Sequence, residues 1–124
     1  MLCDAVSIRD GLLFVLGGGI DRLLLAEYPA VLPVQLAALL ELEWLDQGEE
    51  HELLVCIYDE HVAELGRIQG RFSTTRSLEL DEFARFPVGI PLNAVSLPCP
   101  GSYEVQLLVD GELKAVLPLE ASAR

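Results

Sequence analysis

The sequence predicts an all-β protein in which two antiparallel sheets of short strands pack face to face as a sandwich. Asp10-Gly11 and Asp110-Gly111 each stand between short apolar runs, and an Asp-Gly step readily takes the positive φ angles of a type I′ hairpin turn. Residues 103–109 alternate apolar and polar side chains with the period of a half-buried strand. A chain of 124 residues with 52% hydrophobic residues can form one domain, here residues 1–124, with a sizeable core.

The N-terminal part contains the first predicted hairpin. Residues 3–8 and 12–16 are expected to pair around Asp10-Gly11. The three glycines at 17–19 permit a sharp bend or bulge, because glycine adopts positive φ without strain. Residues 20–25 then form a third short strand.

The middle of the chain holds two longer runs. Residues 34–44 place an apolar row ending in Trp44 opposite Glu41 and Glu43, which is the pattern of a strand. Strong helix formers in the same run favour a helix by local propensity alone. The strict alternation favours the strand. Residues 52–58 form another strand, and we expect the two runs to pair as a central hairpin.

The pattern weakens from residue 60 to residue 86. Residues 62–72 contain enough apolar positions for one strand, residues 73–77 are typical of a loop, and residues 80–86 suggest a short helical turn. A strand resumes at residues 88–97, interrupted by Pro91. The whole chain thus contains about seven to nine short strands, which fits a sandwich better than a parallel α/β sheet.

The second hairpin lies near the C-terminus. Residues 103–109 and 113–119 flank Asp110-Gly111, and Pro118 cannot donate a ladder hydrogen bond. We therefore expect the return strand to end near a sheet edge.

Two resemblances narrow the sandwich type. Residues 100–105, Pro-Gly-Ser-Tyr-Glu-Val, resemble the start of the penultimate strand of immunoglobulin-like domains, where a tyrosine hydroxyl bonds back across a corner. This resemblance implies an immunoglobulin-like antiparallel β-sandwich, although no cysteine pair surrounds Trp44 as in antibody domains. Residues 10–19 (DGLLFVLGGG), taken together with the C-terminal hairpin, are similar to a family of small uncharacterised bacterial proteins, commonest in actinobacteria. That similarity implies a compact β domain and carries no known activity or site residues.

The chain is strongly acidic. Its formal net charge is −12, from twenty Asp and Glu against eight Lys and Arg, and Lys114 is its one lysine. Binding to phosphate groups requires clustered Lys and Arg, so we expect neither nucleic acid nor a membrane as a partner. A protein partner or a second copy of the chain, as in a homodimer, stays open. The sequence indicates no particular small-molecule ligand. An alternative interpretation of the charge is that it only keeps an apolar-rich chain soluble.

The cysteines point to a reducing compartment. Cys3, Cys56 and Cys99 are widely spaced, odd in number and without a CxxC motif, which disfavours zinc and dithiol chemistry. Cys56, within an apolar run, is expected to be a small buried hydrophobe. The apolar run at residues 12–16 is far shorter than the roughly 20 residues that span a bilayer, and no positive segment precedes it. We expect a soluble cytoplasmic protein without a cofactor.

Glycine and histidine supply the first candidate sites. Gly17-Gly18-Gly19 lacks the Gly-Lys-Ser/Thr ending of a phosphate-binding loop and does not match GxGxxG, so a structural bend is favoured. His51 and His61 both adjoin acidic residues, as in metal or acid–base sites. An extended strand over residues 52–60 would hold them roughly 30 Å apart. Each is therefore interpreted as a solvated turn histidine.

Nucleophiles, carboxylates and calcium ligands supply the others. No GxSxG elbow occurs, and Cys99 stands between two prolines in an expected exposed turn. Glu41 and Glu43 share a strand face about 7 Å apart, a separation that glycosidases use and that any solvated strand face also produces. The acidic segments 46–50 and 59–60 do not follow the spacing of an EF-hand loop. The sequence therefore predicts no catalytic, cofactor-binding or metal-binding residue.

The charges are unevenly spread along the chain. Between Leu23 and Gly66 there are ten acids and no Lys or Arg, and four of the eight bases then fall within nineteen residues, at Arg67, Arg71, Arg76 and Arg85. An acidic and a basic region could pair between copies of the chain. The favoured hypothesis is a non-enzymatic binding or assembly module, self-associating through protein–protein contacts. A hydrolase using acidic residues, and a carbohydrate- or calcium-binding accessory domain, are the alternatives.

Overall fold

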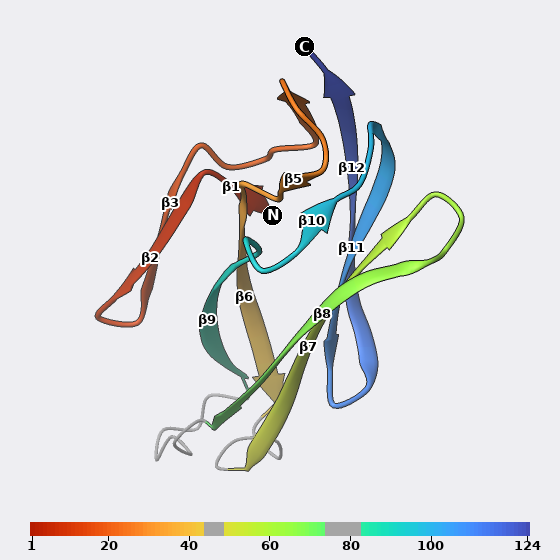
Figure 1. Ribbon diagram of the computed structural model, residues 1–124. Helices are drawn as coiled ribbons and strands as arrows, with labels where there is room; N and C mark the ends of the chain where they lie inside the picture. The colour runs from red at the N-terminus through yellow and green to blue at the C-terminus, as the bar shows by residue number, and fades with distance from the viewer. Residues whose placement is uncertain (44–48, 74–82) are drawn as a thin grey trace.

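The protein is an all-β sandwich, as the sequence predicts (Figure 1). The computed structural model describes residues 1–43, 49–73 and 83–124, and these residues form twelve strands, three of them only two residues long. They contain no helix that is long and apolar enough to cross a membrane. The strands are β1 (Leu2–Cys3), β2 (Ala5–Arg9), β3 (Leu12–Leu16), β4 (Arg22–Leu25), β5 (Ala30–Val31), β6 (Gln35–Glu43), β7 (Glu50–Asp59), β8 (Glu64–Ser73), β9 (Phe83–Pro91), β10 (Ser96–Leu97), β11 (Gly101–Val109) and β12 (Glu112–Ala123).

One layer is a five-stranded sheet with the order β4-β12-β11-β7-β8. β7, β8, β11 and β12 are antiparallel neighbours, and β11 buries every second residue from Tyr103 to Val109. β4 pairs in parallel with β12, but only along residues 120–123. The remainder of β12 therefore has a neighbour on one side only among the described residues.

The other layer is a three-stranded sheet with the order β1-β6-β9. β6 pairs with β9 over its full length, whereas β1 pairs only with Gln35 and Leu36. Ala37 exchanges two further hydrogen bonds with Met1. Beyond Ala37, the side of β6 that faces away from β9 has no strand beside it in the described residues. A separate two-stranded ladder of β5 and β10 closes one end of the sandwich.

The core lies between these two layers. Leu36 and Leu40 of β6 and Val55 and Ile57 of β7 are all buried and belong to one apolar cluster. Because apolar burial is worth roughly 25 cal/mol per Å², this continuous cluster supplies the main driving force for folding. The largest fully buried side chains are Leu2, Leu32, Leu36, Ile57, Leu92, Leu97 and Leu119.

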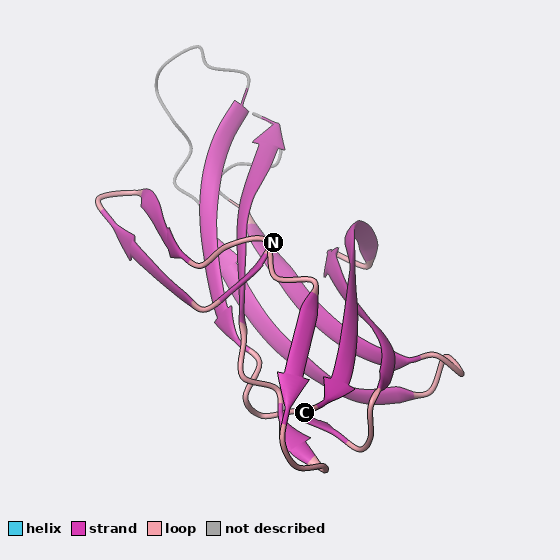
Figure 2. Ribbon diagram, turned by 90° about the horizontal axis from the view of Figure 1, so that it is seen from above, coloured by secondary structure: helices cyan, strands magenta, loops and turns pink. Residues whose placement is uncertain are grey.

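Both Asp-Gly hairpins are confirmed. Their φ angles are 51° and 72° at Asp10 and Gly11, and 52° and 79° at Asp110 and Gly111, as a type I′ turn requires. Hairpin β11–β12 lies inside the five-stranded sheet. Hairpin β2–β3 forms a two-stranded sheet of its own and projects from the sandwich (Figures 1 and 2).

The expected central hairpin is wrong, although both of its strands exist. β6 pairs with β9, and β7 pairs with β8 and β11. The two strands belong to opposite sheets because each has an apolar row, and the rows bury each other by packing face to face. Trp44, the end of the predicted β6 row, lies outside the described residues.

Two further boundaries differ from the sequence prediction. Residues 83–86 belong to β9 instead of a helical turn, because pairing with β6 overrides local propensity; residues 80–82 lie outside the described residues. β12 continues past Leu119 to Ala123 and gains β4 as a neighbour there. Pro118 fits within it because β12 has a free side at this point.

The expected tyrosine corner is present. The Tyr103 hydroxyl donates a hydrogen bond to the backbone carbonyl of Cys99, four residues upstream. Burial raises the pKa of Tyr103 to about 12, and the nearby Cys99 side chain adds to the rise. The hydroxyl therefore stays protonated and fixes the loop before β11 to the sheet.

Candidate functional site

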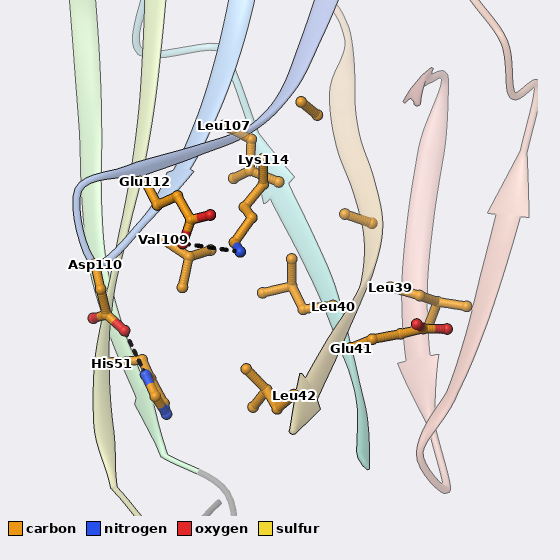
Figure 3. A pocket seen from close by; sticks show the side chains of 12 residues that line it. Leu39, Leu40, Glu41, Leu42, His51, Leu107, Val109, Asp110, Glu112 and Lys114 are labelled. Atoms are coloured by element: carbon orange, nitrogen blue, oxygen red, sulfur yellow. Dashed lines mark hydrogen bonds and ion pairs between the residues drawn. The ribbon is translucent and has the colours of Figure 1, made fainter. Parts of the chain in front are cut away.

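A cleft in the described residues opens between the two sheets (Figure 3). Its volume is about 730 Å³. Leu40 and Leu42 of β6 point into it from one sheet, and Leu107 and Val109 of β11 line it from the other. These four side chains are buried, so the cleft has an apolar floor.

Within the described parts of the chain, two strand edges that lack a neighbouring strand border this cleft. One is the side of β6 that faces away from β9, from residue 38 onward, and the other is the side of β12 from residue 112 to residue 119. Free edges present unpaired N–H and C=O groups, which is where an additional strand can pair. An apolar floor between two such edges is the geometry of a groove for an extended chain.

His51 and Asp110 form a polar pair at one end of the cleft (Figure 3). His51 Nδ1 lies 2.6 Å from Asp110 Oδ2. The other carboxylate oxygen, Oδ1, accepts a hydrogen bond from the backbone N–H of Glu52 at 2.9 Å, and the Asp110 N–H donates to the Glu52 carbonyl. Asp110 therefore ties the β11–β12 turn to β7.

Electrostatics define the direction of the His51 hydrogen bond. The pKa of Asp110 lies below its usual value of 3.8, chiefly because His51 donates to the carboxylate and secondly because the Glu52 N–H does so. An ionised carboxylate has no proton to donate, so Nδ1 of His51 carries the hydrogen of this bond near neutral pH.

An aromatic stack holds His51 from its other side. Its ring lies 5.3 Å from that of Phe72, its cross-strand partner on β8. Phe72 in turn stacks on Phe86 of β9 at 4.6 Å. The stack runs from one sheet to the other, and it fixes the imidazole where only 4% of the residue is exposed.

Charged side chains line the rim of the cleft. Lys114 Nζ lies 3.3 Å from Glu112 Oε2, and both residues belong to β12. The Glu41 side chain points away from the cleft on the outer face of β6, where it pairs at 3.8 Å with Arg85 of β9. Two carboxylates, those of Asp110 and Glu112, thus face the cleft together with one lysine and one histidine.

The interpretation of His51 as a solvated turn residue is wrong. His51 lies within β7, opposite Phe72, and the Asp110 bond and the aromatic stack compensate for its burial. His61 does lie in an exposed turn, where its backbone N–H donates to Asp59 Oδ1. The two histidines stand at opposite ends of β7, as expected.

The other candidate residues fall at separate places. Cys3 and Cys56 are buried, Cys99 is exposed, and all three thiols are free. Of the carboxylate pair, Glu41 is described and the Glu43 side chain is not. Asp59 accepts hydrogen bonds from two turn N–H groups, and residues 46–48 lie outside the described chain. Among the described residues, no three His, Cys, Asp or Glu gather in the manner of metal ligands.

The clustered arginines meet acidic side chains of their own chain. Arg67 pairs with Glu64 at 2.8 Å, and Arg71 lies within 3.6 Å of a carboxylate oxygen of Glu52. Strand register places Arg71 opposite Glu52 and Arg85 opposite Glu41, whereas Glu64 lies three residues before Arg67 on the same strand. Arg76 lies outside the described residues.

Sequence reasoning missed the role of Asp110. It identified Asp110-Gly111 only as a turn signal, because any Asp-Gly step has that property. The contact with His51 joins residues 59 positions apart and depends on β7 lying beside β11. The one hint in the sequence was the position of His51 at the start of a strand.

The fold and the cleft define a small open β-sandwich with a groove between its sheets. A family model describing a family of unknown function (DUF6941) matches residues 1–122, and the chain belongs to this family. No curated protein and no solved structure matches the chain.

Proposed function

We propose that this protein is a non-enzymatic binding module that takes an extended segment of a protein partner into the cleft between its sheets. The main support is that an apolar floor lies between two strand edges that are free in the described residues. These edges are β6 from residue 38 onward and β12 from residue 112 to residue 119. An incoming strand would pair its backbone with one edge and insert alternate side chains into the cleft.

The charge of the rim supports a basic partner. Asp110 and Glu112 face the cleft beside Lys114, and the chain as a whole carries −12. A segment that alternates apolar residues with Lys or Arg would satisfy both the floor and the rim, and the field of the protein would attract it.

Two observations favour binding over hydrolysis. The pKa of Asp110 is lowered, whereas a carboxylic acid that protonates a leaving group needs a raised pKa. The described residues that line the cleft include no Ser, Thr, Cys or Tyr, so a hydroxyl or thiol nucleophile is missing among them. The three free thiols suit a reducing compartment, and we place the protein in a bacterial cytoplasm.

Selection of peptides tests this proposal directly. A phage library of random twelve-residue peptides would be selected on the folded protein, and an enriched peptide titrated into ¹⁵N-labelled protein. We expect alternating apolar and basic sequences, with chemical-shift changes concentrated on β6 and on residues 112–119. Absence of enrichment, or shifts confined to other strands, would contradict the proposal.

Charge reversal gives the matched control. Glu112 is exposed at the rim, so Glu112→Lys should leave the fold intact and lower the affinity for a basic peptide about tenfold. Glu27 is also exposed but does not line the cleft. Glu27→Lys makes the same change in net charge and should weaken binding far less.

A further inference from the structure

β3 is an apolar strand with an exposed outer face. Leu12, Phe14 and Leu16 alternate along it and are 61%, 51% and 66% exposed. Hairpin β2–β3 projects from the sandwich, so no other described strand covers this face (Figures 1 and 2). Exposed apolar stripes of this kind on a monomer commonly mark interaction sites.

The two sides of the hairpin differ in how they are held. On the β2 side, the Val6 N–H donates to Gln35 Oε1 at 2.9 Å, and the Val6 side chain packs so closely over Gly89 that a Cβ there would lie 2.9 Å from Cγ1. β3 has β2 as its one strand neighbour in the described chain. Its other side is therefore a free edge.

The hairpin register identifies which groups of β3 point outward. In a two-residue type I′ hairpin the residues next to the turn, Arg9 and Leu12, form a hydrogen-bonded pair, and the pairs then alternate. Leu13 and Val15 accordingly direct their N–H and C=O groups to the free side. The outward N–H of Val6, opposite Val15, fits this alternation.

The sequence of β3 is close to a palindrome. Leu-Leu-Phe-Val-Leu reads almost the same in both directions about Phe14. An antiparallel copy centred on Phe14 would place Leu13 opposite Val15 in two hydrogen-bonded pairs, and Leu12 opposite Leu16. The two Phe14 rings would then form a directly opposed cross-strand pair on the exposed face.

Charge favours a second copy as the occupant. Residues 5–16 carry one Arg and one Asp, at the turn, and are neutral in a chain of net charge −12. Two such chains repel each other least where they meet through this neutral hairpin. β3 also lacks the lysines, prolines and bulges that usually protect a free edge from pairing.

We propose that the protein forms a symmetric dimer in which β3 pairs antiparallel with β3 of a second copy, with the twofold axis at Phe14. The two hairpins then join into one four-stranded sheet. Five residues a copy make a contact smaller than a standard interface, so we expect dissociation in the micromolar range.

Mass measurement on matched variants tests the surface. Light scattering after gel filtration should show twice the 13.6 kDa chain mass at several hundred micromolar and the monomer on dilution. Phe14→Lys places two like charges directly opposite and should weaken the dimer at least tenfold. Val62→Lys, on a 78% exposed valine in another turn, should leave the dimer unchanged. A protein that stays monomeric throughout, or a dimer insensitive to Phe14→Lys, would overturn the proposal.

A cysteine scan tests the register. Opposed residues in a non-hydrogen-bonded pair lie within disulfide range, so Phe14→Cys in a Cys99→Ser background should cross-link rapidly on mild oxidation. Leu12→Cys lies equally exposed but opposite Leu16, on the order of 13 Å from its own copy. It should cross-link with Leu16→Cys and not with itself. If Leu12→Cys, oxidised by itself, cross-links as fast as Phe14→Cys does, the twofold axis does not lie at Phe14.

Salt provides an independent readout. Because two bodies of like charge are brought together by an uncharged contact, screening should strengthen the dimer about tenfold between 20 and 500 mM NaCl. A contact between acidic and basic patches would weaken over the same range, and that result would contradict the β3 pairing.

Discussion

Hairpins β2–β3 and β11–β12 are built on the same Asp-Gly turn, with φ of 51° at Asp10 and 52° at Asp110, and they have opposite fates in the fold. β11 lies between β7 and β12 and buries alternate side chains in the core. β3 leaves four of its five residues exposed. The turn chemistry determines that a hairpin forms, and the strands that pair with it determine whether the protein itself buries it.

The Asp side chains differ as much as the strands do. Asp110 accepts hydrogen bonds from His51 and from the Glu52 N–H, which bind the turn to β7. Asp10 serves its turn through backbone conformation, and its side chain is exposed. The same dipeptide therefore contributes long-range contacts in one hairpin and only local geometry in the other.

Leucine truncation gives the largest expected contrast. Leu107, 2% exposed, lines the core, so Leu107→Ala should lower the free energy of unfolding by about 3 kcal/mol. Leu12→Ala removes the same atoms from an exposed site and should change it by less than about 0.5 kcal/mol. Urea unfolding at a protein concentration low enough to keep the chain monomeric would measure both changes in the free energy of unfolding. Equal losses would show that β2–β3 is packed as tightly as β11–β12.

Asparagine substitution tests the two aspartates. Asn also tolerates the positive φ of the turn, so the change removes the charge and leaves the backbone intact. Asp110→Asn weakens a charge-assisted bond to a buried imidazole and should cost about 1.5 kcal/mol. Asp10→Asn should cost less than about 0.5 kcal/mol. If both variants unfold at the same urea concentration, His51 gains nothing from Asp110.

The pH dependence of that difference has a defined sign. The folded-state pKa of Asp110 lies below 3.8, so its stabilising contribution is complete above the unfolded value and disappears as the pH falls through the folded value. The stability gap between the native chain and Asp110→Asn should therefore shrink as the pH falls below about 4. Urea unfolding at each pH would measure the gap, and a gap that widens in acid would contradict the assignment of Asp110 as the ionised acceptor.

The sequence predicted where the strands lie more reliably than it predicted which strands pair. Alternation in residues 34–44 and 103–109 identified β6 and β11, because the period of side chains is a local property. The pairing of β6 with β9 instead of β7, and the contact of His51 with Asp110, depend on which sheets pack together. The cleft escaped prediction for the same reason, since its lining comes from β6, β7, β11 and β12.

The smallest expected effect concerns the ion pair on β12. Lys114 and Glu112 are 45% and 74% exposed at 3.3 Å, and solvent screens such a pair. Lys114→Met should change the free energy of unfolding by less than about 0.5 kcal/mol, with little dependence on salt. Thermal melts at 20 and 500 mM NaCl would measure it, and Leu113→Met, on a neighbouring exposed residue, controls for the change in apolar surface. A loss above 1 kcal/mol that salt abolishes would mean that charge, as well as the buried row of β11, holds this hairpin in the sheet. If Lys114→Met leaves the stability unchanged, packing of the buried row is what distinguishes hairpin β11–β12 from hairpin β2–β3.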